Sequence, residues 1–256
     1  MLGILLQRER VLVTAGLALV TALAWAYTVL GVGMPMSAWT MTQMDRAMTM
    51  PTQPWTPVYG VLVFLMWWIM MIAMMLPSAA PVILLHAAIV RRAGSGAGFQ
   101  TAFFVTGYVV MWGAFSIAAT ALHYGLDRTG LLNPMMALGG GTSVGLVLLL
   151  AGVHQLTPLK RSCLDRCRSP VGFLTRYWQR GAWGAFRMGL RHGVFCLGCC
   201  AFLMVLLIAG GIMNLYAIVG LALYVAIEKF WLHEVWSVRI GGLALIGAGV
   251  YFLVAA

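Results

Sequence analysis

The sequence predicts an all-α protein: a polytopic bundle of about seven transmembrane helices with a cytoplasmic N-terminus. Of its 256 residues, 62% are hydrophobic and only 9% are charged, whereas soluble domains average about 25% charged residues. Several apolar segments reach the roughly 20 residues that a helix needs to cross a bilayer. They do not alternate in polarity as the strands of a membrane barrel do. We therefore expect an integral membrane protein built as a single domain, 1–256.

Seven apolar segments account for the predicted bundle, and breaks rich in Gly, Pro or polar residues separate them. Two intervening regions stand out: a Met-rich external loop, 33–57, and a basic, Cys-containing cytoplasmic loop, 159–189. The seven segments are 11–32, 58–84, 98–124, 136–158, 190–212, 213–232 and 239–256.

The net charge of +10 is explained by membrane topology. With seven spans and the N-terminus inside, 14 of the 16 Lys and Arg residues fall on the cytoplasmic side, and only Arg46 and Arg128 fall outside. This bias follows the positive-inside rule of membrane proteins. The sequence contains no nucleic-acid-binding motif, so the lipid bilayer is the expected surrounding and nucleic acid is not an expected partner.

The first segment combines features of a signal peptide and of a membrane helix. Arg8 and Arg10 precede an apolar run, and Ala24-Trp25-Ala26 is a candidate cleavage site. Because the apolar run continues to Val32, we expect an uncleaved first helix. None of the five cysteines faces the oxidising side in this topology, so no disulfide framework is expected.

The external loop concentrates methionine in a segment that should lie in water. Packing does not require thioethers there, and soft thioether ligands favour Cu(I). Three of these residues, Met41, Met44 and Met48, recur at helical spacing, so an amphipathic helix lying on the membrane is the alternative to metal capture. The candidate capture residues are Met34, Met36, Met41, Met44, Met48 and Met50.

The second segment carries a ladder of methionines. Met66, Met70 and Met74 recur at i, i+4 and i+8, and Met71 and Met75 repeat this spacing one step round the helix. Two prolines follow and are expected to interrupt the helix, freeing carbonyls that protein or a polar cavity must satisfy. The thioethers either bind metal or fill gaps in a helix interface.

The fourth segment begins with a packing motif and ends near candidate ligands. Gly141 and Gly145 have the spacing that allows close helix approach. His154 lies about one turn from the cytoplasmic end, and Cys163 and Cys167 follow in the basic loop. If that loop is helical, the two thiols share a face, and neighbouring arginines favour the thiolates. Free cytosolic thiols, transfer of a soft metal and redox chemistry are the open alternatives.

The fifth segment holds the densest sulfur cluster. His192, Cys196, Cys199 or Cys200, and Met204 fall on one stripe of a helix. Three thiols within five residues exceed what packing usually requires, although buried cysteine is also a common small hydrophobic residue. This stripe is therefore the strongest candidate for a metal centre.

The sixth segment opens at Met213-Asn214 and closes with Glu228-Lys229. An ionisable residue inside the membrane boundary indicates function, and Glu228 is a candidate for proton-linked chemistry. The alternative is that Lys229 extends to the headgroups beside it. The final segment carries no obvious chemistry.

Counting along the helices from their cytoplasmic ends places the candidate ligands at similar depths, at about 1.5 Å per residue. Met74 and Met75, the three thiols of the fifth segment, His154 and Glu228 all fall in the inner half of the bilayer. Met, Cys and His together favour Cu(I), whereas Mg or Ca would require oxygen ligands. Zinc with Cys and His ligands is the second candidate.

Five sequence blocks resemble a bacterial family of predicted metal-binding integral membrane proteins, domain of unknown function 2182. The blocks are WWIMMIAMMLPSAAP, QLTPLKRSCLDRCRSP, GVFCLGCCAFLM, GIMNLY and AIEK, between Phe64 and Lys229. The resemblance implies a metal site in a bacterial inner membrane, with no settled reaction. Its motif positions here are Trp67, Met70, Met71, Met74, Met75, Pro77, Ser78, Pro81, Cys163, Cys167, Cys196, Cys199, Cys200, Met213, Asn214, Glu228 and Lys229.

These observations favour a copper-binding protein that acts in copper acquisition, transfer or transport across the inner membrane. Cu(I) would be captured by the outer methionines, pass along the Met ladder, and be held by Cys196, Cys199 and Cys200 before reaching Cys163 and Cys167. The alternative is a copper-dependent membrane oxidoreductase, or a subunit of one, that acts on a hydrophobic substrate. A third hypothesis is non-catalytic: a membrane assembly factor that docks a soluble metallochaperone, or a packing subunit with no metal. The expected protein partner is a soluble metallochaperone or another membrane subunit.

Overall fold

The computed structural model describes residues 2–34, 36–43, 54–94, 96–133, 136–230 and 234–255. Within them, helices form the whole architecture apart from one isolated bridge between Leu132 and Leu138. The helices are α1 (Leu2–Leu30), α2 (Ala38–Gln43), α3 (Pro57–Arg92), α4 (Ala97–Arg128), α5 (Gly141–Leu156), α6 (Pro158–Arg168), α7 (Pro170–Tyr177), α8 (Gly181–Gly210), α9 (Leu215–Phe230) and α10 (Glu234–Val254). The all-α prediction is confirmed.

Each of the seven predicted segments corresponds to one helix, in the order α1, α3, α4, α5, α8, α9 and α10. Among the described residues, five helices are long and apolar enough to cross a membrane: α1, α3, α4, α8 and α10. α5 reaches that length only together with α6, across a bend of 65°. α9 has 16 residues. The count of seven spans and the cytoplasmic N-terminus therefore stay predictions.

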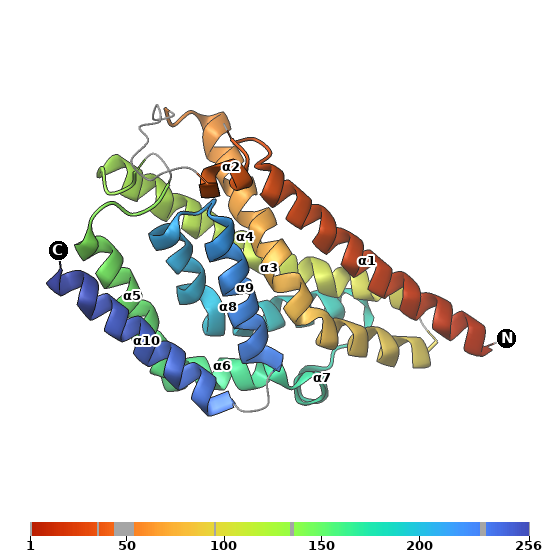
Figure 1. Cartoon of the computed structure of the whole chain (residues 1–256). Helices are drawn as coiled ribbons and strands as arrows, with labels where there is room; N and C mark the ends of the chain where they lie inside the picture. Colours follow the sequence, from red (N-terminus) through yellow and green to blue (C-terminus); the bar gives the residue numbers. More distant parts are fainter. Residues whose placement is uncertain are drawn as a thin grey trace.

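The helices form one bundle in which the chain ends lie far apart (Figure 1). α1 runs along α3 on one side, α5 and α10 pair on the other, and α8 and α9 lie between them. α6 and α7 extend across one end of the bundle. The predicted loop 159–189 thus contains α6, α7 and the first turns of α8.

The α3 helix continues through both of its prolines, Pro77 and Pro81, so the expected interruption does not occur. Polar side chains gather at this point of the helix. The carbonyl oxygen of Met75 accepts hydrogen bonds from Ser78 Oγ at 2.7 Å and from the Tyr108 hydroxyl at 3.0 Å. Protein groups therefore supply the polar partners that backbone near a proline needs inside a membrane.

Glycines allow two helix pairs to approach closely. At Gly107 of α4 and Gly189 of α8, an added Cβ would collide with the backbone of the other helix. Gly145 of α5 faces Gly249 of α10, where a Cβ on either residue would lie 2.9 Å from the other's carbonyl oxygen. Small residues at such interfaces are typical of membrane helices. The predicted packing role of Gly145 agrees with this contact.

The α9 helix begins where the sequence predicted the sixth segment to open. Asn214 Oδ1 accepts a hydrogen bond from Tyr216 N at 3.0 Å, which caps the start of the helix. The hydroxyl of Thr42, in α2, accepts a second one from Leu215 N at 2.9 Å. The second contact anchors the start of α9 to α2.

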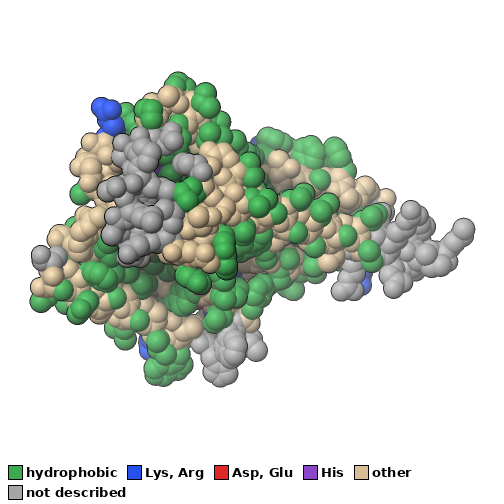
Figure 2. Space-filling model, turned by 45° about the horizontal axis from the view of Figure 1, so that its top comes forward, with side chains coloured by type: hydrophobic (Ala, Val, Ile, Leu, Met, Phe, Trp, Pro, Cys, Tyr) green, Lys and Arg blue, Asp and Glu red, His purple; other side chains and the backbone are tan. Residues whose placement is uncertain are grey.

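Figure 2 shows hydrophobic side chains spread along the visible face, with the few visible Lys and Arg side chains near its edges. Large hydrophobic residues on α1, α9 and α10, among them Leu23, Tyr216 and Leu243, are more than half exposed. A monomeric soluble protein rarely exposes such continuous apolar surface. Together with the long apolar helices, this identifies a membrane protein in contact with lipid.

Candidate metal centre

The three thiols of α8 lie in the centre of the bundle. Cys196, Cys199 and Cys200 are each fully buried and free. The Cys199 and Cys200 sulfurs are 3.2 Å apart, and the Cys199 thiol donates to the carbonyl oxygen of Cys196 at 3.1 Å. The helical stripe predicted from the sequence therefore points inward, away from lipid.

α6 adds two more thiols to this cluster. Cys163 and Cys167 are 7% and 8% exposed, and the Cys167 thiol interacts with those of Cys196 and Cys199. Cys163 Sγ lies against Gly198, where an added Cβ would be only 2.5 Å from it. The predicted shared face of the two cysteines is present, but it packs on α8 instead of facing the cytosol. We call these five cysteines the thiol cluster.

A lysine reaches the thiol cluster from α9. Lys229 Nζ donates to Cys196 Sγ at 3.1 Å and to Ser78 Oγ at 2.8 Å. The Tyr108 hydroxyl lies 3.2 Å from Cys196 Sγ on another side. Cys196 is thus contacted from α4 and α9, and Ser78 of α3 holds the lysine. Lys229 does not extend to the headgroups, because its side chain is buried and directed inward.

The neighbouring residue, Glu228, points to a different site. Its carboxylate accepts from Lys160 Nζ at 2.7 Å and 2.9 Å and from Gln155 Nε2 at 2.9 Å. Lys160 also donates to Gln155 Oε1, and the Tyr224 hydroxyl accepts from Gln155 Nε2 at 2.6 Å. Arg168 donates to the Glu228 carbonyl oxygen, which caps the end of α9. Glu228 therefore has a buried cationic partner.

The two predicted histidine ligands lie at the border of the thiol cluster. His154 stacks on Phe202 with ring centroids 4.5 Å apart and interacts with the backbone of Gly198. His192 lies one turn before Cys196 on α8 and packs among aromatic rings, including Tyr108 at 5.7 Å. The Nδ1 atom of each histidine is buried without a hydrogen-bond partner.

The α3 methionines are all buried in the same core as the cysteines. Met66, Met70, Met74 and Met75 are at most 4% exposed. The Tyr108 hydroxyl joins Met75 to Cys196, because it donates to the Met75 carbonyl oxygen and also contacts Cys196 Sγ. Met66 and Met70 lie farther along the helix toward its N-terminus. The ladder is therefore present as a core stripe, and Met75 is its member tied to the thiol cluster.

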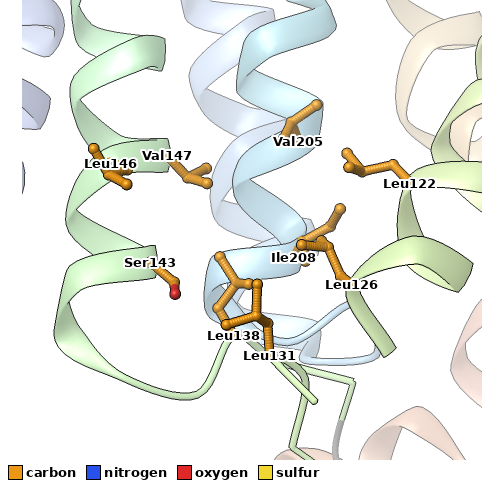
Figure 3. Close-up of a pocket in the computed structure, with 9 residues that line it drawn as sticks. All are labelled: Leu122, Leu126, Leu131, Leu138, Ser143, Leu146, Val147, Val205 and Ile208. Carbon is orange, nitrogen blue, oxygen red and sulfur yellow. The ribbon is translucent and has the colours of Figure 1, made fainter. Parts of the chain in front are cut away.

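Two pockets flank this region, and both are mainly apolar. Met74 and Ser78 line a pocket of about 360 Å³ between α1, α3 and α9. A second pocket, of about 210 Å³, lies between α4, α5 and α8, where leucines, Val205 and Ile208 surround it (Figure 3). The first pocket borders the serine that holds Lys229, whereas the second contains no candidate metal ligand.

The outer methionines are only partly described. Met41 is buried, and Met34 and Met36 are half-buried against the core. Met44, Met48 and Met50 lie outside the described residues. The three described thioethers thus contribute to packing at the α2 end of the bundle.

The chemistry of this centre is that of soft sulfur ligands beside a cation. Within the described ranges, no three His, Cys, Asp or Glu side chains are arranged to hold one metal ion together. Any ion bound here would be held by a smaller set of thiols or would also need methionine thioethers. Soft thiolates and thioethers select Cu(I), and hard cations find few oxygen ligands.

A family model described as PpoB2, copper chaperone, matches residues 64–252. The chain belongs to this family. The match extends from α3 into α10 and includes the whole thiol cluster and Lys229, whereas the outer methionines precede it. Neither a curated protein nor a solved structure matches the chain. Membership of PpoB2 and the apolar helices together make this a copper-related membrane protein.

Three contacts of the centre were not foreseen from the sequence. The pairing of Lys229 with Cys196, the pairing of Lys160 with Glu228, and the fit of Cys163 against Gly198 all join distant segments. The fit of Cys163 against Gly198 could have been predicted from the sequence, because a glycine between cysteines on a membrane helix leaves room for a group from a neighbouring helix.

Proposed function

We propose that this protein binds Cu(I) at the thiol cluster and passes it on, as a membrane-embedded copper chaperone in acquisition or transfer at the bacterial inner membrane. The observation that supports this most is the convergence of thiols from α6 and α8 in one buried cluster. Membership of a family described as copper chaperones points to the same metal.

The ligands in this proposal are two thiols, that of Cys196 and that of one neighbour among Cys167, Cys199 and Cys200, with the Met75 thioether completing the set after small side-chain movements. Cys163, on the same face of α6, would take part in release toward the cytosolic side. The outer methionines would capture copper. Glu228, paired with Lys160, would take part in proton-linked chemistry. The recipient would be a soluble metallochaperone or another membrane subunit.

The test compares copper retention in purified protein. The triple variant C196A/C199A/C200A should lose bound Cu(I) when the protein is prepared from copper-grown cells and measured by elemental analysis. The matched control is Met188→Leu, which removes a buried sulfur from the same helix about two turns away. Equal copper in the wild type and in the triple variant, with both folded, would overturn the proposal.

Copper uptake distinguishes transport from binding alone. If the protein moves copper into the cell, cells with the triple variant should accumulate less copper than cells with Met188→Leu at equal expression. Unchanged accumulation, together with lost binding in purified protein, assigns the protein to transfer within the membrane and not to import.

A further inference from the structure

A buried positive charge lies where the proposed ion would bind. Lys229 Nζ is 3.1 Å from Cys196 Sγ, and the lysine side chain is 7% exposed. A lysine ammonium has three donors and no acceptor, and both contacts of Lys229, to Ser78 Oγ and to Cys196 Sγ, use Nζ as the donor. An ion that enters the thiol cluster therefore meets an ammonium group as well as sulfur.

The ammonium is held in place by groups that are themselves anchored. Ser78 Oγ accepts from Lys229 and donates to the Met75 carbonyl oxygen at 2.7 Å. At the end of α9, Arg168 binds the carbonyl oxygen of Glu228, which fixes the backbone next to the lysine. The ionisable groups that act most strongly on Lys229 are thiols and the Tyr108 phenol, whereas the carboxylate of Glu228 is paired with Lys160.

We propose that Lys229 makes the thiol cluster selective for a monovalent soft ion over a divalent one, an inference that rests on the proposed function. Two thiolates, the ammonium and one monovalent cation sum to zero charge. A divalent ion in the same place leaves one positive charge unbalanced, and a buried unpaired charge is strongly unfavourable. The repulsion by the ammonium also doubles with the charge of the ion.

The small ligand set supports this reading. A third thiolate would balance a divalent ion, but no three His, Cys, Asp or Glu side chains in the described part of the chain are arranged to share one ion. Thioethers bring softness without charge. In a site of two thiolates with methionine support, a monovalent ion therefore gives zero net charge when Lys229 is present. A divalent ion gives zero net charge only when Lys229 is absent.

The experiment uses two soft ions that differ in charge, Ag(I) and Cd(II). Dissociation constants are measured by competition titration on the full chain in detergent, for the wild type, Lys229→Met and Lys229→Arg. Removing the lysine weakens thiolate formation for both ions, so the ratio of the two constants isolates the effect of charge. We expect the preference for Ag(I) over Cd(II) to fall at least about tenfold in Lys229→Met, or about 1.4 kcal/mol, and to persist in Lys229→Arg.

An unchanged ratio in folded Lys229→Met would overturn the inference while leaving the proposed function intact. If that variant does not fold, the wild type and Ser78→Ala decide, since both keep the charge: Cd(II) binding as tight as Ag(I) in either one contradicts selection by Lys229. A wild type that binds neither Ag(I) nor Cu(I) defeats the proposed function itself, and the inference with it.

Discussion

Lys160 Nζ lies 2.7 Å from Glu228 Oε2, with the two side chains 0% and 1% exposed. The pair joins α6, which extends across one end of the bundle, to the last turn of α9. Because Lys229 follows Glu228 directly, one position of α9 holds α6 in place while the next contacts Cys196. Adjacent residues of α9 therefore serve two separate contacts, one with α6 and one with the metal centre.

Breaking this pair should destabilise the protein strongly. In Glu228→Gln, the Lys160 ammonium stays buried without its counter-charge, which typically costs about 3–5 kcal/mol. Thermal unfolding of the detergent-solubilised protein should reveal the loss. The double variant Glu228→Gln/Lys160→Met removes both charges and should recover much of the stability. A single variant as stable as the wild type would show that the pair does not hold α6 on α9.

The helices were predictable because their apolar segments are long and their ends carry glycine, proline and charge. The inward face of the α8 cysteines was also predictable, since their spacing places them on one stripe. The directions of Glu228 and Lys229 were not, because they are defined by partners in other helices, Lys160 of α6 and Cys196 of α8. Spacing within one helix carries no information about such contacts.

The burial of Cys163 and Cys167 escaped prediction for a similar reason. Eleven residues with four basic side chains read as a solvated loop, yet they form α6. One basic residue of this helix, Lys160, is neutralised by a distant carboxylate, which allows the helix to pack against α8. The burial of a short basic helix can therefore be predicted only when the carboxylate that neutralises it is known.

The fit of α6 on α8 should be sensitive to one methyl group. In Gly198→Ala, the new Cβ would lie 2.5 Å from Cys163 Sγ, so the thiol must move away. Overpacking of this kind costs about 1–3 kcal/mol. Thermal unfolding should show the loss, and Ag(I) titration should show weaker binding.

The double variant Gly198→Ala/Cys163→Ala tests the cause. With the sulfur removed, the nearest atom to the new methyl is the Cys163 Cβ at 3.3 Å, which small shifts accommodate. We expect the two changes to couple favourably in unfolding. Gly220→Ala in α9, with nothing within 4 Å, serves as the control and should be neutral or slightly stabilising. Equal losses in the single and double variants would contradict the contact.

The close approach of α4 and α8 should depend on Gly189. A Cβ at this position would collide with the Phe104 carbonyl oxygen, which is backbone and cannot rotate away. Gly189→Ala should therefore push the helices apart and lower the free energy of unfolding by about 1–3 kcal/mol. Gly125→Ala, on α4 with open space around it, is the matched control. Chemical denaturation in mixed micelles measures both, and an unaffected Gly189→Ala would place the interface elsewhere.

The Tyr108 hydroxyl connects the α3 backbone to the thiol cluster, so its removal should affect both. Tyr108→Phe deletes the 3.0 Å hydrogen bond to the Met75 carbonyl oxygen and the 3.2 Å contact with Cys196 Sγ. Ser78 still donates to that carbonyl oxygen, so the stability loss should be only about 1 kcal/mol. Outside the thiol cluster, Lys229 is then the only polar contact that Cys196 keeps with another helix among the described residues. We therefore expect Ag(I) to bind with an altered dissociation constant. Tyr216→Phe, at an exposed position on α9, should change neither quantity. Identical Ag(I) binding in the two variants would separate Tyr108 from the metal centre and leave it a role in packing.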